Sequence, residues 1–389
     1  MPRPKREKFP EEVIAAVCSR FMKCISFDQI AKEVQAEMRA NGDPAFKLSR
    51  QRVYRVIEDA VNSDLFFYSP PAHKELARRI STAFGIPEAR IHVAHARAEA
   101  EPVAARAAEL AIQRIQELDK RVVDIGFAAG GTAMRVARQL AGRLSGFERA
   151  LKLGIHAMSL GVSNPHTLAS PISFFSSFES PIHETEFFGL ECTPVVADAK
   201  GFDALQDQPG VRAAFEAAEK LDLVVTSLCG ADDADGDLMR ASALLSSRPG
   251  RSRDDGLEYL RRQEWVGEVM GRPYNRAGPI DETGRMRIVT LFSIEKLVEF
   301  ASRNRKHVIL VAAPCFGCRK SREVSLLPLL RSPRLKLWTD LVLDVETAGK
   351  LLRLADDEAS HAKSSGATAR PARKREAKPS RSSGLGETA

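Results

Sequence analysis

The sequence contains few cysteines and no long apolar run. Its 389 residues include 6 cysteines, and aromatic residues make up only 6%. So few cysteines exclude a disulfide scaffold and indicate a reducing compartment, so we expect a cytoplasmic protein. No stretch reaches the roughly 18 apolar residues of a membrane-spanning helix, so we expect no membrane partner. Hydrophobic residues make up 44% of the chain, enough for a sizeable core and, at this length, for two or three domains.

The chain also has little net charge outside its two ends. Of the formal charge of +7, residues 1–9 carry about +3 and residues 361–389 about +5, which leaves residues 10–360 at about −1. We interpret residues 1–9 as a basic arm. The C-terminal end is rich in Ser, Ala, Pro and basic residues, so we expect a disordered basic tail over 358–389. Such tails can attract DNA or simply improve solubility, so net charge alone does not establish a nucleic-acid partner.

Residues 10–69 predict a small helical domain. Pro10 precedes a stretch with apolar residues on one face, and Ser26 opens a capping-box pattern ahead of a second such stretch. A third helix is predicted to begin after Ser49, a good N-terminal cap. Leu65–Tyr68 then has the composition of a short strand. Three helices followed by a strand predict a winged helix-turn-helix.

The predicted third helix carries a basic surface. From Lys47 to Arg55 there are four basic residues and no acidic one, in a module of otherwise balanced charge. A short helix that presents long donors near its N-terminus suits the phosphates and base edges of a DNA major groove. The residues expected to contact double-stranded DNA are Lys47, Ser49, Arg50, Gln51, Arg52, Tyr54 and Arg55. A plain helical bundle with a solvated basic face would show the same pattern, and the connection over 39–47 is longer than in most helix-turn-helix pairs.

From about residue 70 the pattern changes to alternating strands and helices. This alternation predicts a doubly wound, mostly parallel α/β domain, which we expect to cover 70–357. A last helix is predicted over Val345–Leu354. The predicted strands are Ile91–Ala94, Val122–Phe127, Leu151–Leu160, Thr193–Val196, Leu221–Ser227, Met286–Thr290, His307–Val311 and Trp338–Val342.

Polar segments follow many of these strands. Gly130–Thr132 lies between a buried-strand pattern and a predicted helix. This arrangement presents free backbone N–H groups to a phosphate. The segment matches neither a dinucleotide-binding fingerprint nor a P-loop. Ligands of open α/β sheets bind at the carboxyl ends of strands, so these segments form the candidate site. They are Gly130–Thr132, Gly161–Asn164, Cys229–Asp233, Gly267–Arg272 and Ala313–Lys320.

Several weak motifs occur along the chain in a fixed order. After the helix-turn-helix come Gly126–Thr132, Gly210–Ala214 leading into Asp222–Val225, Trp265–Tyr274, Val308–Ala313 followed by Lys320, and finally Thr339–Asp340 with Glu346–Ala348. The Trp265–Tyr274 segment is similar to an A-V-G-D-x-x-G-R-F-F pattern, and the last pair to a T-D-x-x-T-A signature. In this order the chain resembles the SorC/DeoR-type sugar-binding transcriptional regulators over roughly residues 10–355.

This resemblance implies a repressor or activator whose C-terminal domain is similar in fold to ribose-phosphate isomerases. That domain would bind a phosphorylated sugar or a similar metabolite and form a homodimer or homotetramer on a palindromic operator. The effector-binding residues that the resemblance implies are Gly130, Gly131, Thr132, Glu268, Arg319 and Lys320. The glycine-rich turn would hold phosphate or hydroxyl groups, Glu268 would accept hydroxyl donors in place of the family's Asp, and a basic residue would face the phosphate.

The sequence departs from the family pattern around this implied site. Ala312-Ala313-Pro314 replaces an A-G-G triplet and is followed by about three extra residues, and the segment Ser173–Phe178 is unusually aromatic. Two other functions therefore stay open. One is a sugar-phosphate isomerase-like enzyme with Glu268 as base and Lys320 on the phosphate; no nucleophile–base pair is evident, so we expect no catalytic residues. The other is a DNA-binding protein whose sensor domain serves only for oligomerisation.

No metal and no cofactor is expected from the sequence. Cys315 and Cys318 form a single C-x-x-C, compatible with a redox role, but a zinc site would need two more ligands, and none is obvious nearby. A run of aspartates resembles a calcium-binding loop only loosely, because the bidentate Glu at the required distance is missing. These aspartates are Asp232, Asp233, Asp235 and Asp237.

Overall fold

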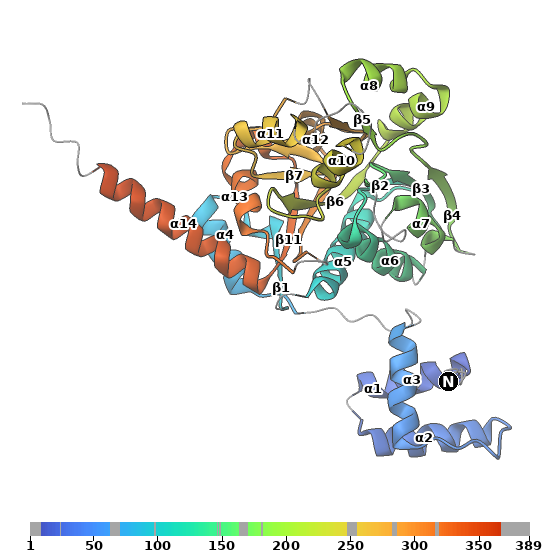
Figure 1. The fold of residues 1–389 in the computed structure, drawn as a ribbon. Helices are drawn as coiled ribbons and strands as arrows, with labels where there is room; N and C mark the ends of the chain where they lie inside the picture. The colour runs from blue at the N-terminus through green and yellow to red at the C-terminus, as the bar shows by residue number, and fades with distance from the viewer. Residues whose placement is uncertain are drawn as a thin grey trace, which may run out of the picture.

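The chain begins with three helices that pack around a core of their own (Figure 1). They are α1 (Glu11–Met22), α2 (Phe27–Ala40) and α3 (Arg50–Asn62), as the sequence predicts. The computed structural model describes residues 9–23, 25–62, 71–96, 99–145, 147, 149–162, 170–179, 182–246, 255–281, 286–315 and 319–366. The strand predicted over Leu65–Tyr68 lies outside these residues.

Side-chain caps start the second and third helices. The Ser26 hydroxyl accepts the N–H of Gln29 at 3.4 Å, and the Ser49 hydroxyl accepts the N–H of Arg52 at 3.3 Å. The long connection between the two helices is held in place, because Leu48 is buried and donates its N–H to the side chain of Gln35 at 3.1 Å. Phe46 and Leu48 therefore anchor the end of this connection to the three-helix core, while residues 39–45 are exposed.

A mostly parallel sheet forms the centre of the second part of the chain. Its strand order is β1-β11-β10-β6-β2-β3-β4, and every neighbouring pair in this order is parallel. This arrangement confirms the predicted doubly wound α/β fold. The strands are β1 (Ile91–Ala94), β2 (Val122–Phe127), β3 (Lys152–Ala157), β4 (Glu184–Phe188), β6 (Leu223–Gly230), β10 (His307–Ala312) and β11 (Asp340–Asp344).

Helices cover both sides of this sheet (Figure 1). Helices α5 and α6 pack on each other and against β6, while α12 and α13 pack against β10 and β6. The helices and short 3-10 turns are α4 (Lys74–Phe84), η1 (Glu88–Arg90), α5 (Ala100–Leu118), α6 (Gly131–Ser145), α7 (Pro171–Phe175), η3 (Ser176–Phe178), α8 (Ala199–Gln206), α9 (Pro209–Ala218), α10 (Asp237–Ser246), α11 (Asp255–Arg262), α12 (Ile294–Ser302), α13 (Glu323–Arg331), η4 (Pro333–Leu335) and α14 (Val345–Gly366).

Several elements differ from the sequence prediction. Two of the predicted strands shrink to β5 (Val195–Val196) and β9 (Arg287–Ile288), which pair antiparallel with each other outside the main sheet. The edge strand β4 was not predicted, because its Glu-Thr-Glu-Phe-Phe sequence lacks the apolar run of a buried parallel strand. Helix α14 continues to Gly366 and so passes both the predicted end at Leu354 and the start of the expected tail at 358.

The segment Gly267–Arg272 forms a hairpin rather than the expected loop. Strands β7 (Gly267–Val269) and β8 (Arg272–Tyr274) pair antiparallel, and β7 also pairs with the end of β6. Between them, Met270 and Gly271 have φ angles of 54° and 72°, the two positive values of a tight type I′ turn. The hairpin carries Glu268 over the carboxyl end of β6, where it sits opposite Cys229.

Candidate functional site

Helix α3 presents a basic, exposed face. Arg50, Gln51, Tyr54 and Arg55 are all exposed, and their spacing along α3 places them on one side of the helix. The side chain of Arg50 is 59% exposed, and Tyr54 packs edge-on against Phe27 at the start of α2, with ring centroids 4.4 Å apart. The hydrogen bond to Tyr54 and the charge of Asp28 raise the pKa of Arg50, which stays fully charged. This face can reach an external polyanion.

The remaining predicted DNA contacts divide into two groups. Lys47 and Ser49 are exposed, and Ser49 already accepts a hydrogen bond as the cap of α3. Arg52 is half-buried: its guanidinium lies 5.4 Å from the centre of the Phe9 ring and donates to the carbonyl of Lys47. The structure therefore places Arg52 in the packing of the three helices, while the other predicted residues lie on their surface.

In the α/β part, three segments meet where the strand order reverses. After β2 the chain adds β3 and then β4 on one side of the sheet. From β6 it adds β10 and then β11 on the other side. The sheet therefore changes direction between β2 and β6, and open α/β sheets bind ligands at such a switch point. The N–H of Ala129, after β2, donates to the Ser159 hydroxyl at 3.0 Å. The N–H of Val162 donates to Asp237 Oδ1 at 3.2 Å. These bonds join the loops after β2 and β3 to the start of α10.

The glycine-rich turn lies at the N-terminus of α6, as predicted. Gly130 has a φ of 118°, which only glycine adopts readily, and α6 begins at the next residue. The first N–H groups of a helix have no partner inside it, and the helix dipole adds partial positive charge there. Gly131 and Thr132 are half-buried at this end. The turn can therefore receive an anionic group on backbone N–H donors.

Glu268 is buried and holds the N-terminus of α10. Its Oε1 accepts the N–H of Asp237 at 2.6 Å and its Oε2 the N–H of Leu238 at 3.1 Å, while the residue is only 2% exposed. Burial and the nearby charge of Asp237 raise the pKa of Glu268 to about 8. Burial also raises the pKa of Asp237. The protonated form of Glu268 is therefore favoured at neutral pH.

A second buried group of this region is Arg322, which the sequence reasoning missed. Its Nη1 donates to Asp233 Oδ2 at 2.6 Å, and the two residues are 6% and 1% exposed. Burial would raise the pKa of Asp233, but the charge and hydrogen bond of Arg322 outweigh it and lower that pKa below its ordinary value. The signal available in the sequence was position: Arg322 immediately precedes α13, and Asp233 follows β6.

The basic residues chosen from the sequence lie farther out. Lys320 is half-exposed and its ammonium donates to Asp232 Oδ2 at 2.7 Å. Arg319 is exposed and has a positive φ of 54°, because the loop closes on itself there: its N–H donates to the carbonyl of Cys315 at 2.9 Å. Arg322 is therefore more deeply buried than either of the two basic residues that the sequence suggested. Cys318 lies outside the described residues.

Comparisons with known proteins connect this architecture to one group of solved structures. No protein-family model and no curated protein matches the sequence. The full-length sorbitol operon regulator SorC of Klebsiella pneumoniae superposes with a TM-score of 0.57 at 15% identity, over 89% of this chain and 100% of that one. A transcriptional regulator from Streptococcus pneumoniae TIGR4 gives 0.53 at 16% identity, over 73% and 97%. A probable sor operon regulator from Shigella flexneri gives 0.51 at 15% identity, over 72% and 98%.

These identities establish a common fold. The match to the full-length regulator includes the whole of that chain, so it covers more than an α/β domain alone. This chain shares its fold with the sorbitol operon regulator SorC and the two other regulators, which confirms the predicted resemblance at the level of architecture. None of the described helices has the length and apolar composition needed to cross a membrane.

Proposed function

We propose that this protein is a DNA-binding transcriptional regulator controlled by an anionic small molecule, a phosphorylated sugar or similar metabolite. In this proposal residues 10–69 bind DNA, residues 70–357 bind the effector and form a homodimer or homotetramer, and no catalytic step occurs. The observation that carries the proposal is the exposed basic face of α3 on a separate three-helix core, in a chain that shares the fold of a full-length operon regulator.

The DNA contact is assigned to the exposed face of α3. Arg50, Gln51, Tyr54 and Arg55 would enter the major groove, where Arg and Gln can form paired hydrogen bonds to base edges. Lys47 and Ser49 precede the helix and would contact phosphates. Two such heads in an oligomer with two-fold symmetry would read the two halves of a palindromic operator.

Selection of genomic DNA fragments by the full chain tests this half of the proposal. We expect enrichment of an inverted repeat, and loss of its specific binding in the double variant Arg50→Ala/Arg55→Ala. The matched control is Arg78→Ala/Arg79→Ala, which removes the same charge from exposed positions on α4. If the α3 variant binds the selected repeat as tightly as the control, α3 is not the recognition helix.

The effector site is assigned to the carboxyl ends of β2 and β6, where the strand order reverses. The N-terminus of α6 at Gly130–Thr132 offers backbone donors, and Arg322 supplies a guanidinium that is almost fully buried. The Nε of Arg322 has no acceptor among the described residues. A buried donor of this kind indicates an anionic partner. The effector would then bind mainly to the N-terminus of α6 and to Arg322. The other predicted residues, Glu268, Arg319 and Lys320, would surround the bound effector.

Thermal-shift measurements with phosphorylated sugars test the effector site. A ligand that binds only the folded state raises the melting temperature, by an amount that grows with its concentration. We expect at least one phosphorylated sugar to do so, and Thr132→Val, which removes one hydroxyl at constant shape, to reduce the shift. Thr82→Val on the exposed side of α4 is the control. Turnover of a sugar phosphate by the purified protein would instead favour the isomerase-like enzyme.

A further inference from the structure

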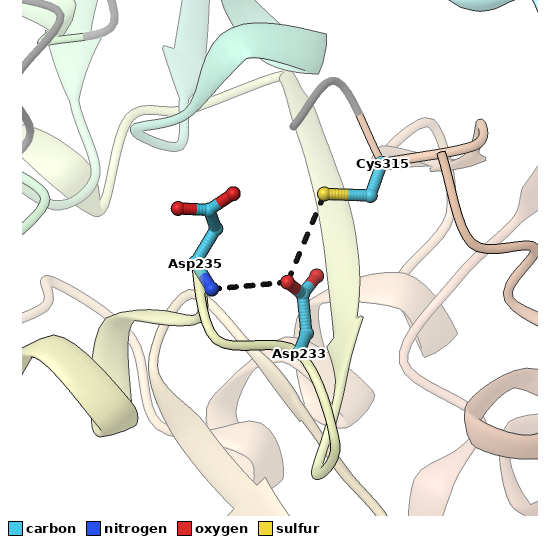
Figure 2. Close-up of side chains that lie close together, drawn as sticks. All are labelled: Asp233, Asp235 and Cys315. Carbon is cyan, nitrogen blue, oxygen red and sulfur yellow. Dashed lines mark hydrogen bonds between the residues drawn. The ribbon is translucent and has the colours of Figure 1, made fainter. Parts of the chain in front are cut away.

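Three potential metal ligands meet at the carboxyl ends of β6 and β10. The Sγ of Cys315 lies 3.7 Å from Oδ1 of Asp233, although 82 residues separate them in the sequence. A carboxylate oxygen of Asp235 lies within 4.8 Å of both atoms. Figure 2 shows the thiol pointing from the segment after β10 toward the two carboxylates, which belong to the loop after β6. The sequence alone offered Cys315 no such neighbours.

The Sγ of Cys315 and Oδ1 of Asp233 are joined by an S–H···O hydrogen bond, and their separation also suits a tetrahedral zinc ion. Zinc–sulfur bonds of about 2.3 Å and zinc–oxygen bonds of about 2.1 Å, at a tetrahedral angle, put the sulfur and oxygen about 3.6 Å apart. The observed separation of 3.7 Å between Cys315 and Asp233 is within 0.1 Å of that value. Asp235 is the exposed member of the group, so an ion can enter from solvent, while the other two ligands are buried.

Arginines orient both carboxylates from behind. Arg322 donates to Oδ2 of Asp233, the oxygen that does not face the thiol, at 2.6 Å, and Arg240 donates to Oδ1 of Asp235 at 2.7 Å. The N–H of Asp235 also donates to Oδ1 of Asp233 at 3.0 Å. Hydrogen bonds to the carboxylates around a metal ion typically fix them in this way.

A separate observation indicates that a ligand is missing beside this group. Arg322 is only 6% exposed, and its Nε has no acceptor among the described residues. The two aspartates and a Cys315 thiolate carry three negative charges, against four positive charges from a divalent ion, Arg322 and Arg240. The remaining positive charge favours an anion or hydroxide at the fourth position of the ion, where its oxygen could accept a hydrogen bond from Arg322.

We propose that Asp233, Asp235 and Cys315 bind one thiophilic divalent cation of the zinc class, with a fourth position open to water or an anion. The thiolate selects such an ion over magnesium or calcium, which prefer oxygen ligands alone. The bound ion joins the loop after β6 to the segment after β10. This proposal does not depend on DNA binding, and it shares Arg322 with the proposed effector site.

Zinc titration of the reduced, metal-free full chain against a chromogenic chelator tests the proposal. We expect one ion per chain, and a cobalt-substituted protein with a thiolate-to-cobalt charge-transfer band. Cys315→Ser and Asp235→Asn should each lower zinc affinity at least about 100-fold. Replacing a residue that only hydrogen-bonds to a metal ligand already lowers metal affinity by about 10- to 100-fold, and loss of a ligand should cost at least as much. Cys315→Ser should also abolish the charge-transfer band.

Two matched variants serve as controls. Asp232→Asn changes the neighbouring carboxylate, which pairs with Lys320, and Cys192→Ser removes a thiol in a distant loop. Both should keep wild-type zinc affinity. The proposal is overturned if the wild type takes up no stoichiometric zinc, or if Asp235→Asn and Cys315→Ser bind it as tightly as these controls. Because Asp235 is exposed, its variant should fold normally, and its melting temperature in chelator checks this.

Discussion

The buried carboxyl group of Glu268 should make the stability of the protein fall as pH rises. Its pKa is about 8 in the folded chain, against an ordinary value of 4.5, because burial and the charge of Asp237 disfavour ionisation. Between these two pH values the folded chain holds a proton that the unfolded chain has lost. Unfolding therefore releases a proton, and the free energy of unfolding decreases with increasing pH.

The expected size of this effect follows from the shift. One proton changes the free energy of unfolding by about 1.4 kcal/mol per pH unit. Between pH 4.5 and about pH 8, an isolated group would therefore lower the free energy of unfolding by about 5 kcal/mol. Asp237 shares the proton, so the slope belongs to the pair and the 5 kcal/mol is an upper bound. The stabilisation is fully present below about pH 4.5 and is lost as the pH passes through about 8.

Denaturant unfolding of wild type and Glu268→Gln across this pH range measures the effect. Glutamine offers one acceptor to the two N–H groups of α10 where glutamate offers two, so we expect a constant loss of about 1 kcal/mol. We also expect the variant's free energy of unfolding to fall less steeply with pH, by the slope that one released proton contributes. Glu264→Gln, on the exposed turn before β7, is the matched control. Parallel curves for wild type and Glu268→Gln would refute the reasoning.

Three further predictions follow from named contacts. In salt titrations of DNA binding, Lys47→Ala should reduce the slope of log affinity against log salt by about one, since it removes an exposed cation assigned to a phosphate. Arg52→Ala should instead mainly lower the melting temperature, because Arg52 packs over Phe9. Burial would raise the pKa of Asp340, but the nearby imidazole of His92 and hydrogen bonds from Arg114 and Thr339 lower it to about 2. The stabilisation from Asp340 is therefore present above about pH 3.8 and lost as the pH falls toward 2. Asp340→Asn should cost at least about 2 kcal/mol at neutral pH by denaturant unfolding. Gly271→Ala should lower the free energy of unfolding by more than about 1 kcal/mol in the same assay, because the φ of Gly271 is 72° and an added Cβ would lie 2.7 Å from Ile288. Equal stability of the variant and the wild type would exclude the tight turn.

Much of the architecture was predictable because it depends on local patterns. The caps at Ser26 and Ser49, the buried run Val122–Phe127 and the glycine turn after it occur where the sequence indicates, since helix starts and buried strands depend on neighbouring residues. The exceptions are elements whose pattern is weak. The exposed edge strand β4 has no apolar run, and the hairpin of β7 and β8 contains two strands of only three residues.

The candidate site was harder to predict, because its chemistry depends on which loops meet. The sequence suggested Lys320 and Arg319, which lie at the surface, and did not indicate that Arg322 pairs with Asp233 in the interior. It also could not show that both oxygens of Glu268 hold the start of α10. Burial and ion pairing are properties of the folded chain and leave no periodic pattern in the sequence.

The sequence by itself determined the order of helices and strands, the basic face of α3 and the glycine turn at α6, because each follows from residues within a few positions of one another. Only the tertiary structure decided which polar groups share a space. The parallel order of β6 and β10 places Cys315 beside Asp233 across 82 residues of sequence, and burial there changes what each group can hold or bind. Parallel neighbours in a sheet are joined by long crossovers, so their loops meet in space without being close in the chain.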